Sequence, residues 1–132
     1  MSRSAIYTAN TTPTALAVGN IIPVGTTVRR FGQCVRQDGN TITLTGPGYY
    51  LVNVSATVAP TAAGTVSVTG QKDGVAVIGA TAAATTTVAA ESENLSLDFI
   101  VRNVGCGSSI LSFALGDAES TVTNLAVTVT KL

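Results

Sequence analysis

Apolar side chains recur at every second position from Gly48 to Val58, and this alternation narrows the range of folds open to the chain. The apolar frame consists of Tyr50, Val52, Val54, Ala56 and Val58. In an extended chain every second side chain points to the same side, so this frame predicts one half-buried β-strand. About ten short segments of this kind, separated by Gly, Pro, Asn and Asp turns, follow one another along the chain. Their regular spacing predicts a β-sandwich or a β-barrel.

Three later segments repeat the alternation and predict further strands. The dipeptide Asp73-Gly74 predicts a tight hairpin, because both residues tolerate a positive φ. Residues 80–90 contain Ala, Thr and one Val, and we expect a strand in the first half and a loop in the second. The residues expected to face inward in the three later strands are Leu95, Leu97, Phe99 and Val101, then Leu111, Phe113 and Leu115, then Leu125, Val127 and Val129.

Small strand-forming residues dominate the chain of 132 residues. Val and Thr are branched at Cβ, which suits a pleated sheet, and helix-forming residues are scarce. The length suits a single domain over residues 1–132, in which residues 1–20 supply an N-terminal strand and lead into the core strands. Seven basic and seven acidic residues give a formal net charge of zero. Because proteins with so little charge tend to associate, we expect an oligomer rather than a monomer.

Several function classes are disfavoured by the residues that the sequence lacks. There is no histidine, which is the commonest general base and metal ligand, so we expect that the protein is not an enzyme. Arg29, Arg30 and Arg36 are too few to form the basic surface that nucleic acids require. No apolar stretch has the length of a membrane span or of a signal peptide. We therefore expect synthesis in the cytoplasm and no insertion into a membrane.

The two cysteines, Cys34 and Cys106, are far apart in the sequence and have none of the spacings of a zinc site. The sequence leaves open a disulfide between them or two buried thiols, and we favour the thiols because nothing in the sequence shows that the two residues meet.

Acidic residues offer two candidate sites. Glu91 and Glu93, together with Asp98, could supply the carboxylate pair of a glycoside hydrolase, but solvated loop charge explains them better. Asp117 and Glu119 could bind calcium, but calcium needs six to eight oxygen ligands, so turn formation explains them better. We therefore expect no cofactor, with calcium as the weak alternative.

The segment Gly48-x-Tyr50-x-Val52-x-Val54 resembles a strand motif of C1q and tumour-necrosis-factor-like domains, with aliphatic residues where that family prefers aromatic ones. The resemblance extends from Ile6 to Leu132 through the order of the strands, and it is strongest to bacterial and bacteriophage members. It implies a jelly-roll β-sandwich of two antiparallel sheets and about ten short strands. The features that follow the family order are a strand near Phe31, a strand with Ile42 and Leu44, the Lys72-Asp73-Gly74 hairpin, strands near Phe99 and Phe113, and a closing valine strand ending at Lys131-Leu132.

The resemblance further implies a compact homotrimer displayed on a surface. From the residues themselves, the faces opposite the apolar frames of the Tyr50 strand and the last strand are small and neutral, which lets subunits approach closely. The alternative is that these faces, and Tyr49 beside them, are exposed to solvent. The residues expected at a trimer interface are Tyr49, Asn53, Ser55, Thr57, Asn124, Ala126 and Thr128.

The function predicted from the sequence is that of a structural or adhesive surface protein. We expect it on a phage particle, as a fibre or decoration protein, or on a bacterial or spore surface, and therefore outside the cell or on the virion. The expected partners are further copies of the chain, a larger virion or surface assembly, or a host surface glycan. The alternative is a soluble, lectin-like jelly roll that binds a ligand.

Overall fold

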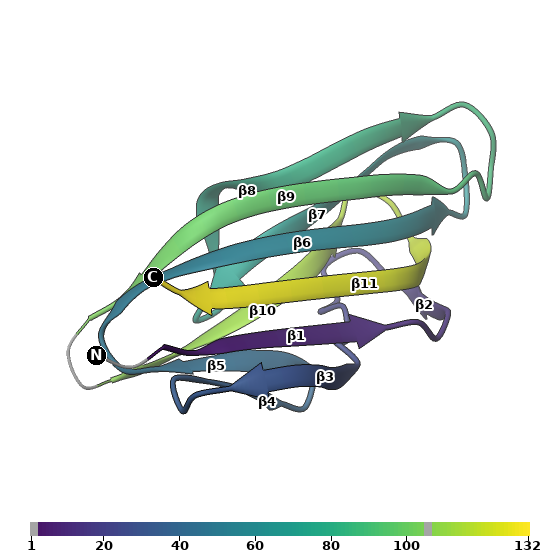
Figure 1. The fold of residues 1–132 in the computed structure, drawn as a ribbon. Helices are drawn as coiled ribbons and strands as arrows, with labels where there is room; N and C mark the ends of the chain where they lie inside the picture. The colour runs from purple at the N-terminus through teal and green to yellow at the C-terminus, as the bar shows by residue number, and fades with distance from the viewer. Residues whose placement is uncertain (1–2, 105–106) are drawn as a thin grey trace.

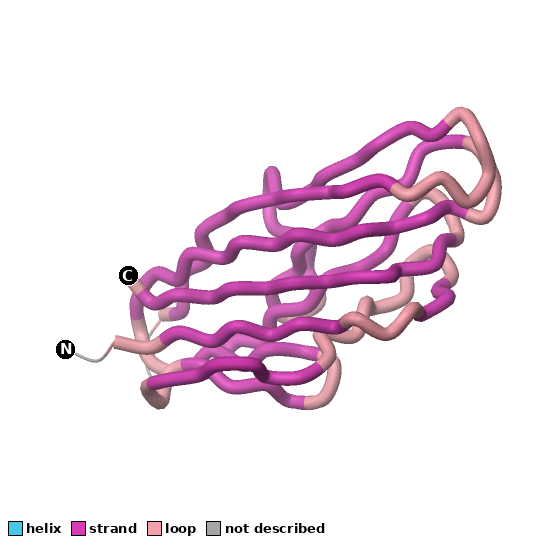
Figure 2. The backbone as a smooth tube through the Cα atoms, turned by 45° about the vertical axis from the view of Figure 1, so that its right-hand side comes forward, coloured by secondary structure: helices cyan, strands magenta, loops and turns pink. Residues whose placement is uncertain are grey.

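The computed structural model describes residues 3–104 and 107–132, and this part of the chain consists of strands and loops (Figure 2). It contains eleven β-strands and no helix, so no helix in the described residues could cross a membrane. The strands are β1 (Ala5–Asn10), β2 (Thr14–Leu16), β3 (Thr26–Phe31), β4 (Val35–Asp38), β5 (Thr41–Thr45), β6 (Gly48–Pro60), β7 (Gly64–Lys72), β8 (Val75–Thr86), β9 (Glu93–Asn103), β10 (Ser108–Gly116) and β11 (Ser120–Lys131).

The strands form two antiparallel sheets that lie face to face (Figure 1). Sheet A has the order β3-β1-β11-β6-β9, with β2 paired to β11 beyond the end of β1. Sheet B has the order β4-β5-β10-β7-β8. The first and last long strands are neighbours, because Ala5 pairs with Thr130. The predicted jelly-roll sandwich of two antiparallel sheets is therefore confirmed.

The chain passes from sheet A to sheet B at Gly32, between β3 and β4. Gly32 has a φ of +81°, and a Cβ atom there would overlap the backbone oxygen of Arg3. Glycine satisfies both the positive φ and the lack of space, because it has no Cβ atom and adopts positive φ at little cost. The chain therefore changes sheet at this glycine.

The core lies between the sheets and contains the predicted apolar frames. Every residue of the β6 frame from Tyr50 to Val58 is buried, as are the inward residues expected in β9, β10 and β11. Phe99 of sheet A meets Phe113 of sheet B edge to face, with ring centroids 6.5 Å apart and an interplanar angle of 62°. Gly70 gives the Phe99 ring its space, because a Cβ there would lie 2.5 Å from Cζ of Phe99.

The predicted hairpin and the predicted end of the following strand are both confirmed. Asp73 and Gly74 have φ values of +54° and +81° in the turn between β7 and β8. The carboxylate of Asp73 also accepts a hydrogen bond from the backbone N–H of Ile110, at 2.9 Å, which ties this turn to β10. Strand β8 ends at Thr86, so residues 80–90 divide into strand and loop as expected.

Tyr50 closes one end of the core with its hydroxyl group. The hydroxyl donates to the carbonyl oxygens of Thr45 at 2.7 Å and Gly46 at 2.8 Å, so it holds the turn that leads into β6. Burial, reinforced by the neighbouring Cys34, raises the pKa of Tyr50 from 10.0 to about 12.

Tyr50→Phe is expected to lower the free energy of unfolding by ~1 kcal/mol, because the two carbonyl groups lose their shared donor. The folded state favours the neutral phenol, so the Tyr50 contribution to stability is complete below pH 10 and is lost between pH 10 and 12. Tyrosinate absorbance measured against pH checks this. Wild-type protein should show a late step near pH 12 that is missing from Tyr50→Phe, and a wild type without that step would contradict the assignment.

Candidate functional site

The seven residues that the sequence assigns to an interface lie on one surface of the protein. We call this surface the outer face of sheet A, meaning the side chains of its strands that point away from sheet B. Six of the seven form cross-strand pairs between β6 and β11. The pairs are Asn53 with Thr128, Ser55 with Ala126, and Thr57 with Asn124. The seventh, Tyr49, is exposed at the start of β6 on the same face.

The strand register arranges the outer face in rows that run across the sheet. Two rows span all five main strands. The Arg29 row is Arg29, Tyr7, Thr128, Asn53 and Asp98, in the order β3-β1-β11-β6-β9. The Phe31 row is Phe31, Ala5, Thr130, Leu51 and Ile100, in the same order.

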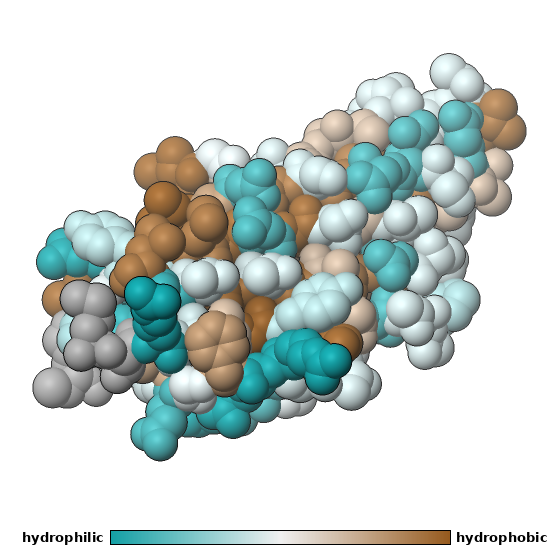
Figure 3. All heavy atoms as spheres, in the orientation of Figure 1, coloured by the Kyte–Doolittle hydropathy of each residue, from teal (hydrophilic) through white to brown (hydrophobic). Residues whose placement is uncertain are grey.

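Large apolar side chains are exposed at one end of the outer face, beside the small and neutral centre. Tyr49 is 52% exposed, Ile100 is 54%, Phe31 is 59% and Leu132 is 62%. Figure 3 shows hydrophobic residues gathered over the end of β6 and β9 near the C-terminus, with paler residues over the middle of the sheet. The guanidinium carbon of Arg102 lies 5.7 Å from the centre of the Tyr49 ring, which is the range of a cation–π contact.

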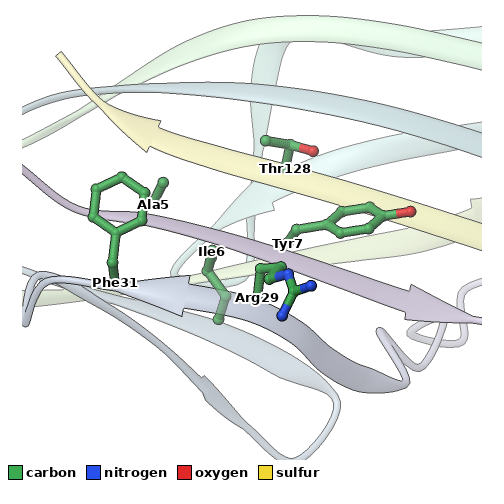
Figure 4. A pocket seen from close by; sticks show the side chains of 6 residues that line it. All are labelled: Ala5, Ile6, Tyr7, Arg29, Phe31 and Thr128. Carbon is green, nitrogen blue, oxygen red and sulfur yellow. The ribbon is translucent and has the colours of Figure 1, made fainter.

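A hollow of about 190 Å³ opens on the outer face where β3, β1 and β11 meet (Figure 4). It exists because small residues stand between two large rings: Ala5 and Thr128 leave space between Phe31 and Tyr7. Arg29 lies beside Tyr7 and forms the edge of the hollow toward β3. The shape and the mainly apolar lining suit a single aliphatic or aromatic group.

The outer face of sheet B has a different character. Thr65 pairs with Thr85, and Thr69 pairs with Thr81, through hydroxyl contacts of 3.1 Å each. Arg36 and Asp38 of β4 form an exposed ion pair at 3.1 Å. Strands of sheet B also expose apolar side chains, namely Ile110 (47%), Val75 (70%) and Ile78 (100%). The outer face of sheet A is the stronger candidate for a contact surface because it combines exposed rings with a small, neutral centre and a hollow.

The other sequence candidates do not converge on a site. Glu93 begins β9, whereas Asp98 lies in the middle of that strand on the outer face. Asp117 has a φ of +67° in the turn between β10 and β11, which is a role in turn geometry. Across residues 3–104 and 107–132, no group of three or more His, Cys, Asp or Glu side chains could hold a metal ion.

Cys34 is partly buried against the core, near Gly46. Cys106 lies outside the described residues, so the favoured pair of thiols and the alternative of a disulfide both stay predictions.

The apolar part of the outer face was not predicted from the sequence. Leu51 and Ile100 are large apolar residues in the outward frames of β6 and β9, where polar residues are expected. Apolar residues at these outward positions were the sequence signal for an exposed apolar surface. The hollow had no such signal, because Tyr7 and Phe31 become neighbours only through the pairing of β1 with β3.

Comparison of the sequence with protein-family models gives no match, and comparison with curated proteins gives none either. Solved structures do match. Murine APRIL at pH 5.0 superposes with a TM-score of 0.76 at 11% identity, over 98% of this chain and 99% of that one. The globular domain of the zebrafish complement 1qA protein gives 0.68 at 11%, over 97% and 95%.

The PRD1 vertex protein P5 gives a TM-score of 0.66 at 14% identity, over 98% of this chain and 96% of that one. The chain has the C1q/TNF-like jelly-roll fold. The predicted resemblance is thereby confirmed at the level of the fold, over nearly the whole length of the C1q/TNF-like chains compared.

Proposed function

We propose that the protein is a non-enzymatic structural or adhesive protein that forms a compact homotrimer through the outer face of sheet A. The observation that carries the proposal is the exposure of Tyr49, Ile100 and Phe31 beside a small, neutral sheet surface. Exposed apolar side chains gathered on one face of a monomer mark a contact surface, because their burial removes apolar area from water.

The size of the outer face fits this role. Its five main strands have 6 to 13 residues each, and at spacings of about 4.8 Å and a rise of about 3.3 Å per residue their faces add up to roughly 800 Å². A stable protein–protein interface of standard size buries about 800 Å² on each partner. The C1q/TNF-like fold typically occurs in trimers, and this supports three copies over two.

The surface or virion role is supported by two observations. The PRD1 phage vertex protein P5 shares the fold over nearly its whole chain. A balanced charge and a rigid sandwich also suit a protein that works by packing. We place the trimer on a phage particle or on a bacterial or spore surface, outside the cell or on the virion, where it contacts the larger assembly or a host glycan.

Light scattering on a sizing column tests the assembly. The expected molar mass is about three times the chain mass of 13.3 kDa, unchanged on dilution. The mass of a single chain would contradict the proposal and leave the outer face of sheet A exposed to solvent.

A second candidate function is ligand binding by a lectin-like jelly roll, and the hollow between Tyr7 and Phe31 is the observation that favours it. Aromatic rings beside Arg29 could hold a small ligand with an apolar side and an acidic group. A monomeric protein that binds glycans in an array, and loses that binding in Tyr7→Ala, would favour this candidate over the trimer.

A further inference from the structure

The two edges of the outer face of sheet A carry complementary groups at the same heights along the strands. In the Arg29 row, the β3 edge carries a cation and the β9 edge carries an anion, Asp98. In the Phe31 row, the β3 side carries the hollow and the β9 edge carries Ile100, a branched apolar side chain that is 54% exposed. Each edge therefore presents what the other edge lacks.

These groups cannot meet within one chain. Arg29 and Asp98 are separated by four strand spacings, or about 19 Å. Among the residues that the structure describes, neither has an oppositely charged partner within 4.0 Å, whereas Arg36 and Asp38 do pair. Both Arg29 and Asp98 are exposed. A partner for either one must come from another molecule.

The hollow has the size and chemistry to accept one apolar side chain. An apolar cavity of about 150 Å³ binds a benzene molecule, and this hollow measures about 190 Å³. Ile100 is suited to fill it, because it is branched, exposed and at the edge of the sheet in the same row as two of the lining residues, Ala5 and Phe31. Tyr49 is less suited, since its ring already contacts Arg102.

Ring symmetry brings the two edges together. In a closed ring each interface joins one patch of a subunit to a different patch of the next. A rotation about an axis that runs along the strands leaves every residue at its own height, so groups of the same row can meet.

We infer that, in the trimer, Ile100 of one copy fills the hollow beside Ala5 of the next, while Asp98 of the first copy pairs with Arg29 of the second. This inference rests on the trimer proposed above. It states that the β9 edge of one copy contacts the outer face of the next copy near β3 and β1. The Arg29 row and the Phe31 row together fix the register of this contact.

A charge swap tests the pairing. Arg29→Asp and Asp98→Arg, made singly, place like charges against each other at all three interfaces. We expect each to raise the chain concentration of half-dissociation at least ~100-fold, measured by light scattering over a dilution series. The double variant restores the opposite charges and is expected to return to within ~10-fold of wild type. The matched control is Arg36→Asp, an exposed change of the same kind on sheet B, which should stay trimeric.

A cysteine pair tests the hollow separately. Ala5→Cys combined with Ile100→Cys places two thiols about 14 Å apart in one chain, which is too far for a disulfide within it. Oxidation is expected to give covalent trimers on a non-reducing gel from the double variant and not from either single variant.

The outcomes separate this inference from the trimer itself. A wild-type monomer overturns both. A wild-type trimer that tolerates both single reversals, or that stays dissociated in the double reversal, overturns the pairing and leaves the trimer standing. A trimer whose cysteine pair gives no covalent product overturns the placement of Ile100 in the hollow.

Discussion

Ala126→Arg is expected to yield a folded monomer where the wild type is a trimer. Ala126 lies in the middle of β11, between Ala9 and Ser55 in neighbouring strands, so it occupies the centre of the outer face of sheet A. Arginine would bring bulk and an unpaired charge into a close, neutral contact, and such a charge costs several kcal/mol when it loses water. We expect the chain concentration at which half of the trimer is dissociated to rise at least ~100-fold. Because the trimer dissociation constant scales with the square of that concentration, this rise corresponds to ~5.6 kcal/mol per trimer. Light scattering measures the assembly, and far-ultraviolet circular dichroism checks the fold.

The matched control for this variant is Ala83→Arg. Ala83 is also a small residue in the middle of a strand, but it is exposed on β8 at the edge of sheet B, opposite Ser67. Arginine there can extend into water, so the trimer should persist. If both variants assemble like wild type, the interface is not on the outer face of sheet A. If both dissociate, added charge alone disrupts assembly and the position of Ala126 is not the cause.

The fold could be predicted from the sequence because each strand and turn is recognisable from residues that lie close together in the chain. The alternation around Tyr50 and the Asp73-Gly74 turn each depend on residues that are near one another in the chain. The same frames also identified which side of β6 and β11 faces outward. The predicted outward residues from Asn53 to Thr57 therefore lie where the sequence places them, on one face of one sheet.

The rows across the sheet could not be predicted, because they depend on pairing between distant strands. Tyr7 stands between Thr128 and Arg29, which are far from it in the sequence. The register between β1 and β3 also shifts after Tyr7, at a bulge that leaves Val28 out of the pairing. Alternation alone gives the face of a residue and not its row, since a two-residue slip keeps every side chain on the same face.

The two outer faces differ in whether their exposed side chains can form hydrogen bonds within the chain. On sheet B the exposed threonines bond to one another across β7 and β8, as Thr65 does to Thr85. On sheet A the end near the C-terminus carries exposed apolar side chains, such as Leu132 and Ile100, beside Arg102. The apolar side chains have no hydrogen bonds to make with water or with a neighbour. A surface of the first kind is stable in water, whereas one of the second kind gains free energy when a second molecule covers it.

Phe113→Ala is expected to lower the free energy of unfolding by ~3–5 kcal/mol, the range for a fully buried aromatic residue. Phe113 is 0% exposed in the central strand of sheet B, and it touches Phe99 of sheet A edge to face. Its loss leaves a cavity between the two sheets, and hydrogen-bonded strands on both sides limit how far the core can close over it. Because domains are stable by only ~5–15 kcal/mol, this variant should lose a large share of its stability. Denaturant unfolding measures the effect, at one fixed chain concentration because assembly adds to apparent stability.

The control for Phe113→Ala removes apolar side-chain atoms from a loop position that is exposed to water. Val88 is 61% exposed in the loop between β8 and β9, and Val88→Ala should change the free energy of unfolding by less than ~0.5 kcal/mol. Phe113→Leu keeps most of the apolar volume and should fall between the two. A cost below ~1 kcal/mol for Phe113→Ala would contradict the contact between the sheets at Phe99 and Phe113, because a buried ring can be removed cheaply only where its neighbours collapse into the space.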